Sequence, residues 1–151
     1  MARYLGGQLI RVCSAFEVRE VPDAKPIDKR RLWIPSVQWK PGGTEDDPET
    51  IGRRVLFKYA GYLAEKRACG DASHFAAATD FRLATELLGR IHREPAEVAT
   101  AEASAMTEVQ SILAQPKVWQ AVVAVAEVLY EAGEMHPAAA TRLIDGRLNE
   151  R

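Results

Sequence analysis

Apolar side chains recur at helical spacing through the second half of the chain. Asp47 can accept hydrogen bonds from free backbone amides and Pro48 fits the first helical position, so a helix is predicted to begin there. The pair Gly70-Asp71 ends it, because glycine readily adopts the backbone that closes a helix. One face of this helix is apolar, which is typical of a helix packed on a core. The face consists of Ile51, Val55, Tyr59 and Tyr62, with Leu56, Ala60 and Leu63 beside it.

Four more helices are predicted after the first, separated by prolines and glycines. They run from between Ser73 and Thr79 to about Ile91, from Ala96 to about Ala114, from Lys117 to Ala132 and from Pro137 to Leu148. Their apolar stripes predict that five side chains are buried. These five are Leu83, Leu87, Val122, Val125 and Leu129.

The first part of the chain has the alternating pattern of strands. Gln8 to Val12 and Ala15 to Glu20 are predicted as two short strands, and Arg31 to Gln38 as a third. Pro35 lacks a backbone donor, so the third strand is expected at a sheet edge or to carry a bulge. Two readings stay open for Met1 to Gly7: the last turn of a helix stopped by glycines, or a disordered terminus.

These elements predict an α+β fold that is mostly α. We expect a small N-terminal β-sheet packed on a bundle of four longer helices and a short C-terminal helix. Residues 1–151 are expected to form a single domain, with a strand and loop part at 1–47 and a helical part at 48–148. A chain of 151 residues, 47% hydrophobic and 27% charged, has enough apolar material for such a core.

Charge and cysteine content narrow the expected partners and compartment. The formal net charge is −1, so neither nucleic-acid nor membrane binding is expected, and no apolar run approaches the roughly 20 residues of a membrane span. The start of the chain also lacks the pattern of a signal peptide. Cys13 and Cys69 are read as free thiols of a reducing compartment. We therefore expect a cytoplasmic protein with a protein or peptide partner, while its oligomeric state stays open.

Two blocks of sequence stand out, YAGYLAE at Tyr59–Glu65 and AATDFRLATELL at Ala77–Leu88. Together they resemble the peptidase domain of the FtsH-type AAA+ zinc metalloproteases, the M41 peptidases. In that family an A-G-x-x-A-E-like helix precedes an N-D-x-x-x-A-T helix, whose Asp is the third zinc ligand. The resemblance extends over about Val55 to Ile144. It implies that Asp80 occupies the ligand position and that Ala84-Thr85 is the A-T pair.

The two-histidine half of the family's zinc site is missing. No His-Glu-x-x-His motif occurs, and no two of the three histidines are spaced i,i+4. His74 precedes Asp80 by six residues, and such a lone pair is not expected to form a zinc site. Glu65 is read as structural or solvated rather than as a general base. We therefore predict no catalytic residue and no cofactor in the chain as given, with zinc expected only if a His-Glu-x-x-His helix is restored upstream.

Three hypotheses remain open. The recorded start is too late and the zinc helix has been lost, or the chain is a complete pseudopeptidase that serves as an interaction module. In the third, the resemblance is accidental and the chain is a helical binding protein. An in-frame His-Glu-x-x-His upstream of Met1 would separate the first two. Apart from the resemblance, the helix dipole explains an acid at Asp80 if Thr79 caps that helix and Asp80 lies in its first turn.

Overall fold

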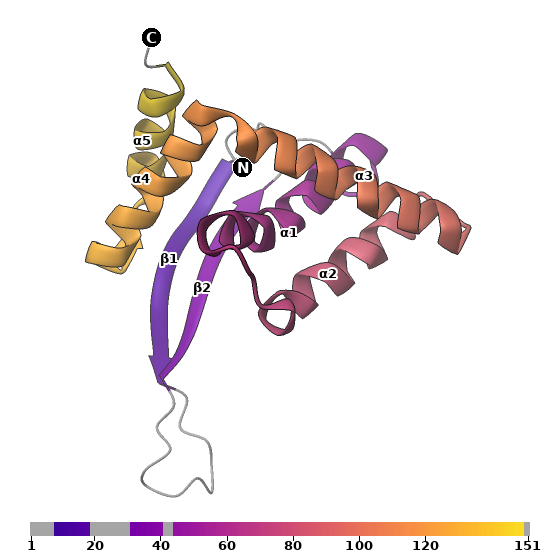
Figure 1. Cartoon of the computed structure of the whole chain (residues 1–151), viewed down its shortest axis with the longest axis horizontal. Helices are drawn as coiled ribbons and strands as arrows, with labels where there is room; N and C mark the ends of the chain where they lie inside the picture. Colours follow the sequence, from indigo (N-terminus) through magenta and orange to yellow (C-terminus); the bar gives the residue numbers. More distant parts are fainter. Residues whose placement is uncertain (1–7, 19–30, 41–43, 150–151) are drawn as a thin grey trace, which may run out of the picture. The chain divides into compact units, whose positions relative to one another are not determined.

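The structure, a computed structural model, describes the backbone of residues 8–18, 31–40 and 44–149 and the side chains of residues 44–149 (Figure 1). These residues divide into two compact units. The first contains Gln8 and residues 44–119, and the second contains residues 9–18, 31–40 and 120–149. The elements in chain order are β1 (Gln8–Val18), β2 (Arg31–Lys40), α1 (Pro48–Cys69), α2 (His74–Leu88), α3 (Pro95–Ala114), α4 (Pro116–Ala132), β3 (Glu134–Met135) and α5 (Pro137–Asn149).

Both ends of α1 are fixed by the residues that predicted them. The Asp47 carboxylate accepts hydrogen bonds from the Thr50 backbone N–H at 2.9 Å and the Thr50 hydroxyl at 3.0 Å. Pro48 follows at the first helical position, where its missing N–H costs nothing. Gly70 ends the helix in the left-handed region, at φ 79°, and its N–H donates to the Lys66 carbonyl. The predicted boundaries of α1 are confirmed.

Prolines and a glycine also mark the later helices as predicted. Pro95, Pro116 and Pro137 are the first residues of α3, α4 and α5. Gly133, at φ 77°, follows the last residue of α4. The start of α2 at His74 lies within the predicted range, and only its end differs, since α2 stops at Leu88, three residues before the predicted end.

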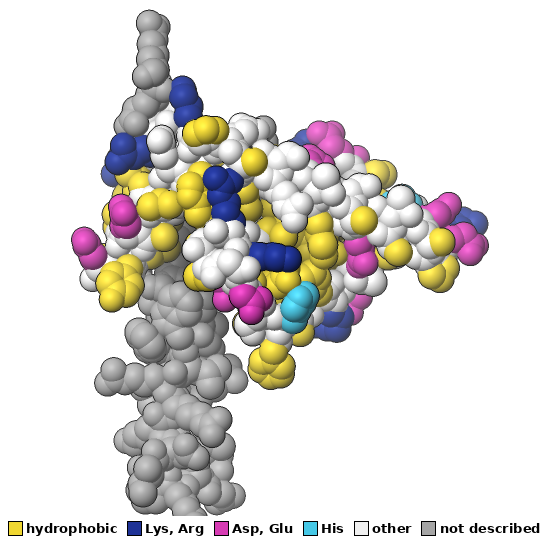
Figure 2. Space-filling view, viewed as in Figure 1, with side chains coloured by type: hydrophobic (Ala, Val, Ile, Leu, Met, Phe, Trp, Pro, Cys, Tyr) yellow, Lys and Arg dark blue, Asp and Glu magenta, His cyan; other side chains and the backbone are white. Residues whose placement is uncertain are grey.

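In the first unit, α1 packs against both α2 and α3, and α2 also touches α3. The apolar stripe predicted for α1 faces this contact. Figure 2 shows hydrophobic side chains gathered between the helices, with charged side chains mostly toward the outside. The buried apolar side chains of the three helices are Ile51, Val55, Leu56, Tyr59, Leu63, Ala84, Leu87, Leu88, Val109, Ile112 and Leu113.

In the second unit, β1 and β2 lie side by side (Figure 1), and β3 is hydrogen-bonded to the other edge of β1, in the order β2-β1-β3. β1 pairs with β3 antiparallel, with Val12 opposite Met135 and Cys13 opposite Glu134. The two strands predicted between residues 8 and 20 are one continuous strand, and Pro35 lies within β2. A small core forms around the end of α4 and the start of α5. It consists of Met135, Ala140, Leu129, Ala139 and Leu143.

The predicted fold class, an α+β fold with a small N-terminal sheet packed on a bundle of four longer helices and a short C-terminal one, is wrong. Residues 44–149 are 82% helical, with five helices, and the two-residue β3 is the only strand among them. The apolar stripes of α1, α2 and α3 cover one another, whereas α5 and most of α4 belong to the second unit. An alternating pattern shows that one face of a strand is apolar, but it does not show which element covers that face.

The burial predictions are correct for Leu87 and wrong for the other four side chains. Leu83, Val122, Val125 and Leu129 are each half-buried. In α4 the buried side chains are instead Val118, Ala121 and Ala124. Residues 121–126 of α4 are all apolar, so helical periodicity alone does not select the inward face. The predicted helical turn at Met1–Gly7 lies outside the described residues.

Candidate functional site

Asp80 lies in the second turn of α2, not in the first turn as predicted. Ser73 is the N-cap, and its hydroxyl accepts a hydrogen bond from the Ala76 N–H at 3.2 Å. Serine caps a helix better than threonine, and the three alanines that follow favour helix, so α2 starts six residues earlier than a Thr79 cap would allow. The interpretation of Asp80 as a residue of the first turn, favoured by the helix dipole, is therefore wrong.

The Asp80 carboxylate binds Lys58 of α1. The distance from Lys58 Nζ to Asp80 Oδ1 is 2.9 Å, which is a charge-assisted hydrogen bond. The Lys58 side chain is 28% exposed and the Asp80 side chain 50% exposed. A pair this close to solvent contributes about 0.2–1 kcal/mol to stability. Its main effect is local, because it directs the carboxylate of α2 toward α1.

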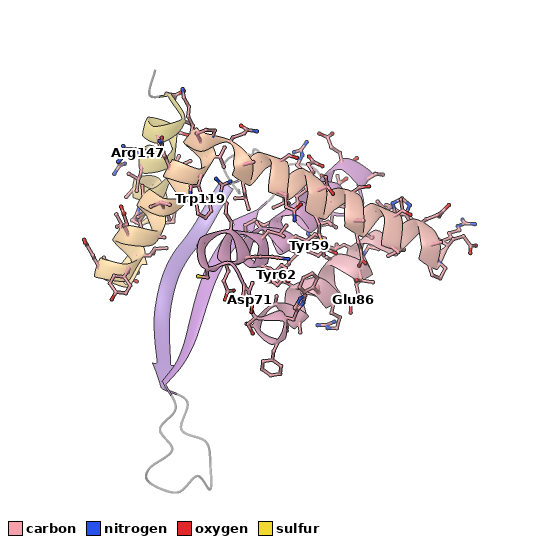
Figure 3. The ribbon with its side chains drawn as sticks, in the orientation of Figure 1. Tyr59, Tyr62, Asp71, Glu86, Trp119 and Arg147 are labelled. Carbon is pink, nitrogen blue, oxygen red and sulfur yellow. The ribbon has the colours of Figure 1, made fainter. Side chains whose placement is uncertain are left out.

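Four aromatic rings adjoin this ion pair and form what we call the α1–α2 aromatic cluster: Tyr59, Tyr62, His74 and Phe81. The Tyr62 hydroxyl and His74 Nε2 lie 2.8 Å apart, within hydrogen-bond distance. Phe81 lies 5.4 Å from Tyr59 and 5.0 Å from Tyr62 between ring centroids, and it stacks on His74 at 5.8 Å. Figure 3 shows Tyr59 and Tyr62 near the contact between the two helices.

His74 and Asp80 are not brought together. A separation of six residues turns a helix by about 240°, so the two side chains leave α2 in different directions. His74 is held by Tyr62 and Phe81 of the aromatic cluster, and Asp80 is held by Lys58. Their sequence spacing therefore gives no shared ligand site.

The Tyr59 hydroxyl is buried between α1, α2 and α3, a feature that the sequence analysis missed. Tyr59 is only 1% exposed, and its hydroxyl has no hydrogen-bond partner within the described part of the chain. Burial, and then the nearby Glu102 carboxylate of α3, raise the pKa of this hydroxyl far above its ordinary value. Thr85 of α2 donates a hydrogen bond to that same carboxylate. The sequence did contain a sign of this buried hydroxyl, because a tyrosine lies in the apolar stripe of α1 and a buried phenol usually needs a polar partner.

The residues described do not fit the zinc site that the M41 resemblance implies. Among residues 44–149, no three His, Cys, Asp or Glu side chains lie close enough to share an ion. His92 lies outside α2, the helix that carries Asp80. It lines a shallow depression of about 480 Å³ with Ala96, Glu97, Thr100 and Ala101. Glu65 lies on the exposed surface of α1. Asp80 is the single residue to which the resemblance assigns a ligand position within the described part of the chain.

Comparisons with protein-family models, with curated proteins and with solved structures found no match for this chain. They neither support nor contradict the resemblance to the M41 peptidases, which still depends on the two sequence blocks. Within the described ranges, no single helix has both the length and the apolar character that a membrane span needs. Only α3 and α4 taken together pass by length and composition, and those two helices meet at a bend of 84°.

Proposed function

We propose that this chain is an M41-peptidase-like domain in which Asp80 holds the third-ligand position, and that it has no peptidase activity in the form given. One observation carries the proposal. The helices that bear the two resembling blocks, α1 and α2, pack against each other, and Asp80 presents its carboxylate beside that contact. An aspartate that only capped its helix would turn back onto the first amides of α2, where Ser73 acts instead.

The absence of peptidase activity is argued from the ligands that the sequence lacks. A zinc peptidase needs two imidazoles and a third ligand on the metal, with a carboxylate to accept a proton from the bound water. The sequence has no His-Glu-x-x-His motif to supply them. The chain is therefore a pseudopeptidase, or it requires an upstream zinc helix that the given sequence does not include.

Restoring the missing helix tests the assignment of Asp80. We would extend the chain upstream with a helix that carries His-Glu-x-x-His and measure zinc affinity by competition with a chromophoric chelator. The extended chain should bind zinc tightly, and Asp80→Asn should abolish tight binding while circular dichroism shows an unchanged fold. Equal zinc affinity with and without Asp80→Asn would show that Asp80 is not the third ligand, and the proposal would fall.

A second candidate function is a non-catalytic protein-interaction module, and Phe75 favours it. Phe75 in the first turn of α2 is 93% exposed and follows His74 of the aromatic cluster. Exposed aromatic residues commonly anchor protein interfaces, so the expected partner is a protein or peptide. We place this interaction in the cytoplasm, a reducing compartment in which the exposed Cys69 thiol stays free.

A peptide-display selection against the immobilised chain tests this second function. Phe75→Ser should remove binding of most selected peptides. Tyr130→Ser is the matched control, because Tyr130 is an equally exposed aromatic residue, at 92%, on α4 of the second unit. Peptides that bind both variants as well as the unchanged chain would exclude Phe75 as the anchor.

A further inference from the structure

The break between α3 and α4 consists of one residue. Gln115 follows the last residue of α3, has an extended backbone at φ −65° and ψ 125°, and precedes Pro116, the first residue of α4. Pro116 has no backbone N–H and its ring would clash with the Ile112 carbonyl, which disfavours a straight continuous helix. The two helices meet at a bend of 84°. A residue at the end of an element can act as a hinge, so this bend depends on the contacts that hold its two sides.

One side chain of α1 contacts both sides of this joint. The Arg67 guanidinium donates a hydrogen bond to the Leu113 carbonyl in the last turn of α3. A carbonyl in the last turn of a helix has no partner within that helix, so Arg67 supplies a donor to it. The guanidinium carbon also lies 4.4 Å from the centroid of the Trp119 ring in the first turn of α4, which is a cation–π contact. Arginine suits both roles, because its planar group donates hydrogen bonds and stacks on aromatic faces.

We propose that Arg67 is a latch for the hinge at Gln115, and that it sets the direction of α4 relative to α3. The latch has a fixed side, because α1 packs against α3. It can also open, because Arg67 is an exposed residue and water can replace its contacts. When the guanidinium leaves Trp119, α4 loses this tie to α1 and can pivot about the Gln115 backbone. The latch does not involve Asp80, so it is independent of the proposed function.

Distances between spin labels on the two helices test the latch. Nitroxides would be attached to the exposed positions Ser104→Cys on α3 and Ala126→Cys on α4, in the full chain with Cys13→Ser and Cys69→Ser. Double electron–electron resonance then gives the distribution of distances between the labels. Arg67→Met keeps the length of the side chain and removes the guanidinium. The share of molecules outside the main distance should rise about tenfold, because a hydrogen bond from a charged donor and a cation–π contact are both lost.

Arg53→Met is the matched control. Arg53 also lies on α1, and it pairs with Glu49 of the same helix, so its loss should leave the distance distribution unchanged. Trp119→Leu provides a second variant. It removes the ring and leaves the Arg67 contact with the Leu113 carbonyl, so it should also broaden the distribution. Circular dichroism checks that each variant folds, and if Arg67→Met loses helix content, Trp119→Leu decides in its place.

Two results would overturn the inference. One is a folded Arg67→Met chain whose distance distribution equals that of the unchanged chain, whatever Trp119→Leu does. The other is an equal broadening in Arg53→Met, which would show that the loss of any positive charge from α1 has the same effect. Broadening in Arg67→Met alone would support the latch and assign it to the hydrogen bond with α3.

Discussion

At the scale of single residues, Tyr59 combines an aromatic ring that packs in the apolar core with a hydroxyl that is buried there and unsatisfied within the described residues. The ring packs on Phe81 of α2, while the hydroxyl lies beside the Glu102 carboxylate, a contact that raises the pKa of the hydroxyl but does not give it a well-formed hydrogen bond. A buried polar group without a partner costs about 1–3 kcal/mol. Glu102 accepts from Thr85, so an acid from α3 and a hydroxyl from α2 meet at this phenol. A substitution that removes only the Tyr59 hydroxyl therefore tests how this group contributes to stability.

Tyr59→Phe should leave the free energy of unfolding unchanged or raise it by up to about 1 kcal/mol, because the ring is kept and an unpaired hydroxyl is removed. Chemical denaturation at neutral pH measures this. Tyr62→Phe is the matched control, since it removes a hydroxyl that lies 2.8 Å from His74 Nε2. A loss of more than about 1 kcal/mol for Tyr59→Phe would show that the Tyr59 hydroxyl does have a stabilising partner.

The same hydroxyl predicts how stability depends on pH. Burial and Glu102 raise the pKa of Tyr59 in the folded chain, whereas the unfolded chain loses this proton near pH 10. Above that pH the folded state binds more protons than the unfolded state, so the contribution is fully present below about pH 10 and is lost as pH rises further. The free energy of unfolding should fall as pH rises above about 10, and it should fall less steeply for Tyr59→Phe. Parallel curves would contradict the assigned pKa shift.

At the scale of elements, the sequence predicted helices well where a residue has one local role. Asp47 and Gly70 fix the ends of α1 through hydrogen bonds to residues three or four positions away, so a short window of sequence contains the whole cause. The start of α2 was harder because Ser73 and Thr79 both qualify as caps. The choice between them moved Asp80 by almost two turns and changed the interpretation of its role.

Leu87 and Leu83 of α2 provide a paired test of how the helices pack. Leu87 is buried and Leu83 is half-buried, although both lie on the predicted apolar line. Leu87→Ala should cost roughly 2–5 kcal/mol of unfolding free energy, because it leaves a cavity among α1, α2 and α3. Leu83→Ala should cost clearly less, since solvent already reaches that side chain. Equal losses in chemical denaturation, or a loss below about half a kcal/mol for Leu87→Ala, would show that this orientation of α2 is wrong.

At the scale of the whole molecule, local pattern failed wherever distant segments meet. Lys58 and Asp80 are 22 residues apart on different helices, and no spacing rule pairs them. The short β3 adds to β1 from beyond α4, which alternation within residues 8–38 could not indicate. In α4 nearly every position is apolar, so burial of Ala121 rather than Val122 depends on neighbours. The boundaries of most helices were therefore predictable, whereas the extents of the strands, the assembly of the elements and the partner of the candidate site were not.

The last prediction concerns activity. The purified 151-residue chain should not hydrolyse casein, because the sequence has no His-Glu-x-x-His motif and Asp80 is paired with Lys58. Release of fluorescent peptides from labelled casein measures this, with and without added zinc, and a zinc peptidase of known activity serves as the positive control. Slow cleavage that a chelator does not affect would indicate a contaminating protease. Cleavage that a chelator stops, that zinc restores and that Asp80→Asn abolishes would contradict the prediction, since the chain would then hold a working metal site without the family's two histidines.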